Sequence, residues 1–201
     1  LLAEVVTEAG WAVSAEDSIR MFKGHDLNEI VIEVERRVGR PLPGLLEEYR
    51  ARMFAAFDAG IDPIEGAAEL LDALDAAGGP RRCVASNGPQ NKMHASLSAA
   101  GLLDRFGCDG VRRIYSAYDI QRWKPDPGLF LHAAGAMGVA PNRCVVIEDS
   151  VTGVVAARAA TMPVVALAGL TDAETLANAG ANRVIDSMHT LARWLEPLAP
   201  R

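Results

Sequence analysis

The stretch Arg143–Ala160, RCVVIEDSVTGVVAARAA, carries the pattern from which the fold can be predicted. Its short apolar run ends abruptly in two adjacent carboxylates, Glu148 and Asp149, and a helix-like segment begins directly after them. An apolar run followed by a helical pattern is typical of one strand–helix unit of a parallel sheet. The two acids therefore stand at the carboxyl end of a predicted buried strand.

The same alternation extends from Ile61 to the end of the chain. Five short apolar runs, each preceded by a helical pattern, predict an α/β, Rossmann-like core with a parallel sheet and helices on both faces. The runs are CVAS (83–86), RIYS (113–116), CVVIE (144–148), PVVAL (163–167) and RVI (183–185); the helices are 67–77, 92–100, 128–137, 151–160 and 173–179. In such sheets ligands bind beyond the carboxyl ends of the strands, which is where the chemistry is expected.

Residues 1–60 show a different pattern, with four amphipathic helical segments joined by short links. One of them carries an apolar stripe at helical spacing, formed by Leu27, Ile30, Val31, Val34 and Val38. The segment GIDPIEG follows as a Gly/Pro-rich joint. We therefore expect two domains, an α-helical bundle over 1–60 and the α/β core over 61–201.

Composition excludes several classes of partner. The chain has 201 residues, half of them hydrophobic, and a net charge of −6, which argues against a nucleic-acid or anionic-membrane partner because these favour a basic surface. No apolar stretch approaches the roughly 18 residues that span a bilayer. Cys83, Cys108 and Cys144 are odd in number and widely spaced, which indicates reduced packing residues and a cytoplasmic protein. The sequence does not determine the oligomeric state.

Two predicted strand ends carry groups that suit a phosphate. Ser86, Asn87 and Gly88 form a strand-to-helix turn, where backbone N–H groups and a hydroxyl could bind phosphoryl oxygens. An ordinary Ser-Asn-Gly turn is the alternative. Lys124 precedes the helix-start signal Asp126-Pro127 at the same edge. Alone, Lys124 would be read as a solvated surface charge, but its location favours a functional role.

The pair Glu148–Asp149 completes this set. Side chains alternate between the two faces of a strand, so the two acids are not expected to contact the same partner atom. We expect Asp149 to contact the partner directly and Glu148 to support it from the next layer of residues. Adjacent carboxylates repel unless a cation compensates, and Mg²⁺ typically takes one or two carboxylates plus phosphate and water. A solvated acidic loop with Ser150 as N-cap is the alternative. Together the three strand ends supply the hydroxyl, fixed cation and metal site that phosphoryl transfer requires.

With these motifs in this order, the sequence resembles the haloacid dehalogenase superfamily, in its phosphatase and phosphomutase branch with a helical cap. SNG (86–88), Lys124 of KPDP and IEDS (147–150) resemble its second, third and fourth motifs. SNGPQNKM with YDIQRWKPDP is most similar to 6-phosphogluconate phosphatase-like members. The resemblance implies that 1–60 is the cap.

The family's first motif, a D-x-D-G segment with the nucleophilic aspartate, has no counterpart in the sequence. The nearest imitation is FGCDGV, where Gly107 stands at the nucleophile position and the segment precedes the wrong strand. Because the cap normally follows the first motif closely, the motif is expected just upstream of Leu1. A sheet without that strand would expose unpaired backbone on both sides of a gap.

The resemblance implies a Mg²⁺-dependent phosphatase acting on a small phosphomonoester, such as a sugar or sugar-acid phosphate, through an aspartyl-phosphate. Ser86 and Lys124 would be catalytic, the 86–88 turn would bind phosphate, and Asp149 with Glu148 would hold Mg²⁺. In the cap, Lys23, Gly24 and His25 are candidate specificity residues, although a solvated loop is an alternative.

Four other functions remain open at this point. A β-phosphoglucomutase-like phosphomutase or a phosphoglycolate phosphatase would share every motif. A dehalogenase would need no metal, and the Glu148–Asp149 pair argues against it. A non-catalytic binding module is expected if the first motif is absent.

Overall fold

The computed structural model of the chain describes residues 1–22, 27–76, 78–108 and 111–195. They form two compact units, Leu1–Gly60 and Ile61–Arg201. Lys23, Gly24 and His25, the candidate cap residues, lie outside the described residues. None of the described helices is both long enough and apolar enough to cross a membrane.

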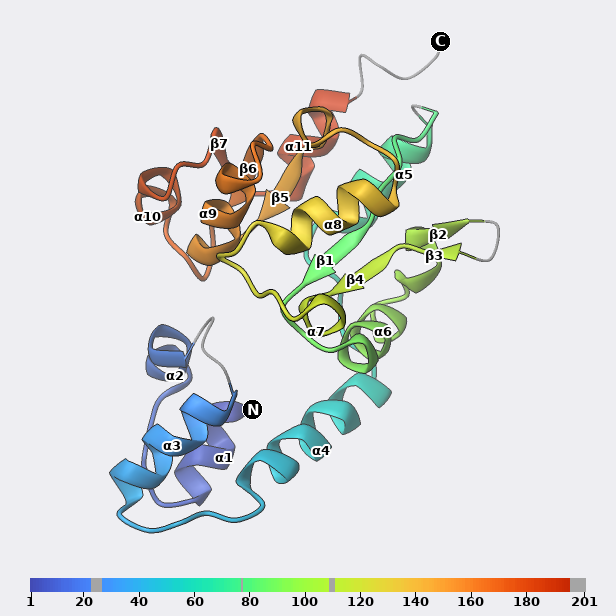
Figure 1. Cartoon of the computed structure of the whole chain (residues 1–201). Helices are drawn as coiled ribbons and strands as arrows, with labels where there is room; N and C mark the ends of the chain where they lie inside the picture. Colours follow the sequence, from blue (N-terminus) through green and yellow to red (C-terminus); the bar gives the residue numbers. More distant parts are fainter. Residues whose placement is uncertain (23–26, 77, 109–110, 196–201) are drawn as a thin grey trace. The chain divides into compact units, whose positions relative to one another are not determined.

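Unit Leu1–Gly60 is helical, as the sequence predicts (Figure 1). Its helices are α1 (Leu2–Glu8), α2 (Ala15–Phe22), α3 (Leu27–Val38) and α4 (Leu45–Asp58). Ser14 caps α2, because its Oγ accepts the Asp17 N–H at 3.0 Å. The apolar faces of α1, α2 and α3 meet in one cluster, which consists of Val6, Phe22, Ile30, Val34 and, from the loop before α4, Leu42. Arg52 on α4 binds Glu8 on α1 at 2.6 Å and so ties two of the helices together.

The second unit contains all five predicted strands, and every pairing between them is parallel. Strand β1 (Val84–Ser86) pairs with β4 (Ile114–Ser116), and β5 (Val146–Glu148), β6 (Val164–Leu167) and β7 (Arg183–Ile185) pair in that order. The α/β fold class is therefore confirmed. These five strands are divided between two sheets. Among the described residues, β1 and β5 each have one neighbouring strand.

Helices follow the strands as predicted, with ends that differ by one or two residues (Figure 1). The predicted helices are α5 (Ala67–Ala76), α6 (Gln90–Ala99), α8 (Gly128–Ala136), α9 (Val151–Ala159) and α10 (Ala173–Asn178). Helices α7 (Ala117–Ile120) and α11 (Met188–Leu195) and the 3-10 turns η1 (Leu103–Phe106) and η2 (Pro141–Arg143) were not predicted. An antiparallel pair, β2 (Gly107–Cys108) with β3 (Val111–Arg112), was not predicted, because two-residue strands are too short to show an alternating pattern.

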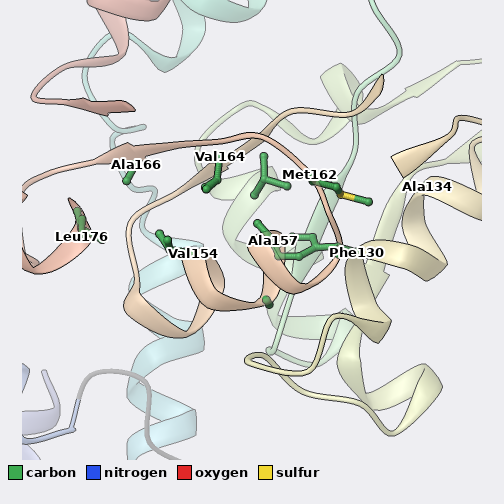
Figure 2. Packing of buried hydrophobic residues seen from close by; sticks show 11 residues of the cluster. Phe130, Ala134, Val154, Ala157, Met162, Val164, Ala166 and Leu176 are labelled. Atoms are coloured by element: carbon green, nitrogen blue, oxygen red, sulfur yellow. The ribbon is translucent and has the colours of Figure 1, made fainter. Parts of the chain in front are cut away.

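The core of this unit lies where α8 and α9 pack against each other and against the strands. Figure 2 shows its buried apolar side chains, which come from α8, β5, α9, β6 and α10. Small residues dominate the α9 face, since Ala156 and Ala157 are fully buried. Alanine side chains let the helix approach β6 closely, because they project little beyond the backbone. This packing fixes the start of α9 beside the end of β5, where the acidic pair stands.

Candidate active site

The turn after β1 is held on both sides by serine hydroxyls. Ser86 Oγ accepts the Gly88 N–H at 3.1 Å, and Ser116 Oγ donates to the Gly88 carbonyl at 2.8 Å. Ser86 and Ser116 are register partners at the carboxyl ends of β1 and β4, so the pairing of these strands brings both hydroxyls to one turn. Ser116 is buried. The sequence-predicted phosphate turn is therefore a rigid element at the carboxyl edge of its sheet.

Asn87 joins this turn to Lys124, which lies 37 residues further along the chain. The Asn87 side chain accepts the Lys124 N–H at 2.8 Å and donates to the Lys124 carbonyl at 3.2 Å. Both polar groups of the Lys124 main chain are thus engaged by one amide, beside a cis Lys124–Pro125 peptide bond. Two of the three predicted strand ends are therefore in direct contact. The amide acts here as a positioning group, a role that the turn pattern alone does not reveal.

The Lys124 ammonium forms a buried ion pair with Glu148. Lys124 Nζ contacts Glu148 Oε1, and the two side chains are 9% and 8% exposed. The ammonium also lies 4.6 Å from the centre of the Phe130 ring, over its face. A buried pair is tolerated when further hydrogen bonds satisfy its remaining polar atoms. The ammonium is therefore fixed from two sides, by a carboxylate and by an aromatic ring.

The second oxygen of Glu148 receives donors from the start of α9. Glu148 Oε2 accepts the N–H groups of Asp149 and Ser150 at 3.1 and 3.3 Å and the Ser150 hydroxyl at 2.9 Å. Ser150 Oγ also accepts the Gly153 N–H at 3.1 Å, so Ser150 is the N-cap that the sequence suggested. A carboxylate offers about four acceptor positions. The three donors converge on Oε2 and Lys124 contacts Oε1, so most of the acceptor capacity of Glu148 is used and its carboxylate holds Lys124 in position.

Asp149 differs from Glu148 in its exposure. Its side chain is exposed, and its main-chain carbonyl accepts the Thr171 hydroxyl at 2.8 Å. Within the described ranges, no three His, Cys, Asp or Glu side chains group closely enough to hold a metal ion together. Mg²⁺ nevertheless often takes one or two carboxylates and completes its shell with phosphate and water. The donor set fits a site of that kind with Asp149 as a protein ligand, whereas the metal-ligand role predicted for Glu148 stays a prediction.

One further charged side chain lies beside the phosphate turn. Lys92, the third residue of α6, has its Cδ 3.7 Å from the position where a Cβ on Gly88 would stand. Burial lowers the pKa of the Lys92 ammonium from its usual value. Sequence reasoning missed this residue because a lysine inside a helical pattern reads as a solvated surface charge. The available signal was its place in the first turn of the helix that follows the phosphate turn.

The chain is similar in sequence to known hydrolases. The sequence pattern of haloacid dehalogenase-like hydrolases matches residues 5–161. The 6-phosphogluconate phosphatase of Escherichia coli (strain K12) is 41% identical over 148 residues, which are 73% of this chain and 63% of that protein. The chain thus spans less than two thirds of this curated relative. The validoxylamine A 7'-phosphate phosphatase of Streptomyces hygroscopicus subsp. limoneus is 30% identical over 81% of this chain and 67% of its own length.

Solved structures extend the similarity over nearly the whole chain. A haloacid dehalogenase-like protein of unknown function from Agrobacterium tumefaciens has a TM-score of 0.81 at 33% identity and covers 99% of this chain and 90% of its own. A hydrolase of this family from Deinococcus radiodurans R1, with bound phosphate and sodium, has a TM-score of 0.79 at 33% identity. It covers 98% of this chain and 86% of its own.

Proposed function

This chain belongs to the haloacid dehalogenase-like hydrolase family, and we propose that it is a Mg²⁺-dependent phosphatase of a small phosphorylated metabolite. The observation that carries the proposal is the fixed Lys124 ammonium, whose main chain is bound to the 86–88 turn and whose side chain is bound to Glu148. A fixed cation beside oriented hydrogen-bond donors is what a transferring phosphoryl group requires. The phosphate bound by the Deinococcus radiodurans relative supports the same class of ligand.

The substrate that we propose is a sugar phosphate or sugar-acid phosphate similar to 6-phosphogluconate. This assignment is supported by the 41% identity to the Escherichia coli 6-phosphogluconate phosphatase. Recognition by a cap formed from residues 1–60, including Lys23, Gly24 and His25, is part of the same proposal. The cytoplasmic location expected from the unpaired cysteines stays a prediction.

Each group at the site has a role that follows from its chemistry. The Ser86 hydroxyl and the Asn87 N–H bind phosphoryl oxygens, and Lys124 neutralises charge on the phosphoryl group. Glu148 holds Lys124 in position, and the Asn87 side chain fixes the Lys124 main chain. Asp149 would hold Mg²⁺, which supplies positive charge to the phosphoryl oxygens when it is bound. Covalent aspartyl-phosphate chemistry needs an aspartate beyond this set and stays a prediction of the resemblance.

Phosphomonoester hydrolysis with and without Mg²⁺ tests the proposal. We expect release of phosphate from a panel of 6-phosphogluconate, hexose phosphates and phosphoglycolate, and loss of this activity after chelation. Asp149→Ala should abolish the Mg²⁺-dependent turnover, while Asp58→Ala, which removes an exposed aspartate of α4, should not. Unchanged turnover in Asp149→Ala would refute the metal role. A requirement for a bisphosphate would identify a phosphomutase, and no turnover of any substrate would leave a binding module.

A further inference from the structure

Lys92 extends over the phosphate turn from the first turn of α6. Its Cδ and the Ser86 Oγ lie 3.7 and 3.5 Å from the position of a Cβ on Gly88, so both side chains approach the same point. Helical side chains lean towards the N-terminus of their helix, which is the direction of this turn. The lysine stem therefore packs against the backbone that the proposed phosphatase uses to hold phosphate.

Among the described residues, no counter-charge explains the position of the Lys92 ammonium. Within the part of the chain that the structure describes, no carboxylate forms an ion pair with it, whereas Lys124 is paired with Glu148. Burial penalises its charged form and lowers its pKa. A positive charge in the first helical turn is also disfavoured by the helix dipole, whose positive end lies there. An anion bound beside the ammonium would offset both the cost of burying its charge and the repulsion by the helix dipole.

The charge balance of the site points in the same direction. Glu148 already compensates Lys124, and Asp149 adds a further negative charge beside it. A phosphomonoester that carries two negative charges thus meets no excess of positive charge from these three residues. Lys92 adds one further cation, whose stem lies against the Gly88 backbone at the start of α6.

We propose that the Lys92 ammonium binds an anionic oxygen of the substrate, together with the Ser86–Gly88 turn, and so acts as a substrate-binding residue that Lys124 does not replace. The inference rests on the proposed phosphatase function. The anionic oxygen belongs either to the phosphoryl group or to an acid group elsewhere on the substrate, and both sources present the same chemistry to an ammonium. Because charge-assisted hydrogen bonds are strong, loss of this contact should cost about ten- to a hundredfold in kcat/KM.

The test compares Lys92→Met, which keeps the apolar stem over Gly88, with Lys92→Arg, which keeps the charge. Arg143→Met removes an exposed cation from η2 and is the matched control. Binding is measured as the rise in melting temperature caused by inorganic phosphate and by 6-phosphogluconate. Turnover is measured with 6-phosphogluconate and with glucose 6-phosphate, which share the phosphate ester and differ in the acid group.

We expect Lys92→Met to lose kcat/KM and ligand stabilisation, and Lys92→Arg and Arg143→Met to retain most of both. If Lys92 contacts the phosphoryl group, both substrates lose equally and the effect of inorganic phosphate disappears. If it contacts the acid group, only 6-phosphogluconate is affected. Lys92→Met with unchanged kcat/KM and unchanged stabilisation by both ligands would overturn the inference. If the wild-type protein hydrolyses no substrate, the proposed function fails, while the binding measurements still test Lys92.

Discussion

Replacing Gly153 with alanine should destabilise the protein, although alanine is the better helix former. Gly153 is the third residue of α9, and a Cβ at this position would overlap the Glu148 carboxylate carbon and both of its oxygens. The absence of a side chain at Gly153 is therefore what lets Glu148 lie against the first turn of the helix. Gly153→Ala should push Glu148 away from Lys124.

The magnitude follows from two opposing effects. Alanine in a helix interior is favoured over glycine by about 0.5–1 kcal/mol. Displacing Glu148 breaks an ion pair whose side chains are 9% and 8% exposed, and leaving a buried charge without its partner costs about 3–5 kcal/mol. The net loss in the free energy of unfolding should therefore be about 2–4 kcal/mol, and phosphatase activity should fall with it.

Urea denaturation followed by circular dichroism measures this difference. Gly135→Ala is the matched control, because Gly135 lies inside α8 and no atom comes within 4 Å of its added Cβ. The control should gain about 0.5–1 kcal/mol. Combining Gly153→Ala with Glu148→Gln should cost much less than the sum of the two changes, since both disrupt one ion pair. A gain of stability in Gly153→Ala equal to that in Gly135→Ala would refute the reasoning.

Two further predictions concern groups on either side of β1. Burial, with a smaller contribution from the neighbouring Cys144 thiol, raises the pKa of the Cys83 thiol to about 11. The stabilisation that this shift gives is present below about pH 9 and is lost as the pH rises towards 11. Over this interval the free energy of unfolding of the wild type should therefore fall by on the order of 2 kcal/mol more than that of Cys83→Ala. Urea midpoints of the two proteins that change in parallel with pH would contradict this prediction. Asn87→Ala should lower the free energy of unfolding by about 1–3 kcal/mol and reduce kcat, because the Lys124 main chain loses both partners. Asn178→Ala, at an exposed end of α10, should leave both quantities unchanged, and equal effects of the two changes would argue against a positioning role for Asn87.

Much of the fold and the composition of the site could be predicted because their signals are local. The run before Glu148 and the helical pattern after Ser150 determine β5 and α9 without reference to the rest of the chain. The rule that strands of a parallel sheet present their carboxyl ends at one edge then brings Ser86, Lys124 and Glu148 together. The structure has these residues in contact through Asn87 and the ion pair. Where each strand ends was therefore sufficient to select candidates.

The contacts themselves could not be predicted, because they depend on geometry between distant segments. Nothing local shows that the Asn87 amide meets a main chain 37 residues away. Gly153 reads as a tolerated helix glycine until the position of Glu148 is known.

The two neighbouring acids have different surroundings because the chain turns between them. Glu148 is the last residue of β5 and points inward, where Lys124 and the start of α9 satisfy both of its oxygens. Asp149 follows at the turn and remains exposed. Because Glu148 balances the charge of Lys124 while holding it at the site, a phosphate with two negative charges needs further positive charge, which Lys92 and a metal ion at Asp149 would supply under the proposed function. The proposed specificity of the site therefore depends on the cations that Glu148 does not neutralise.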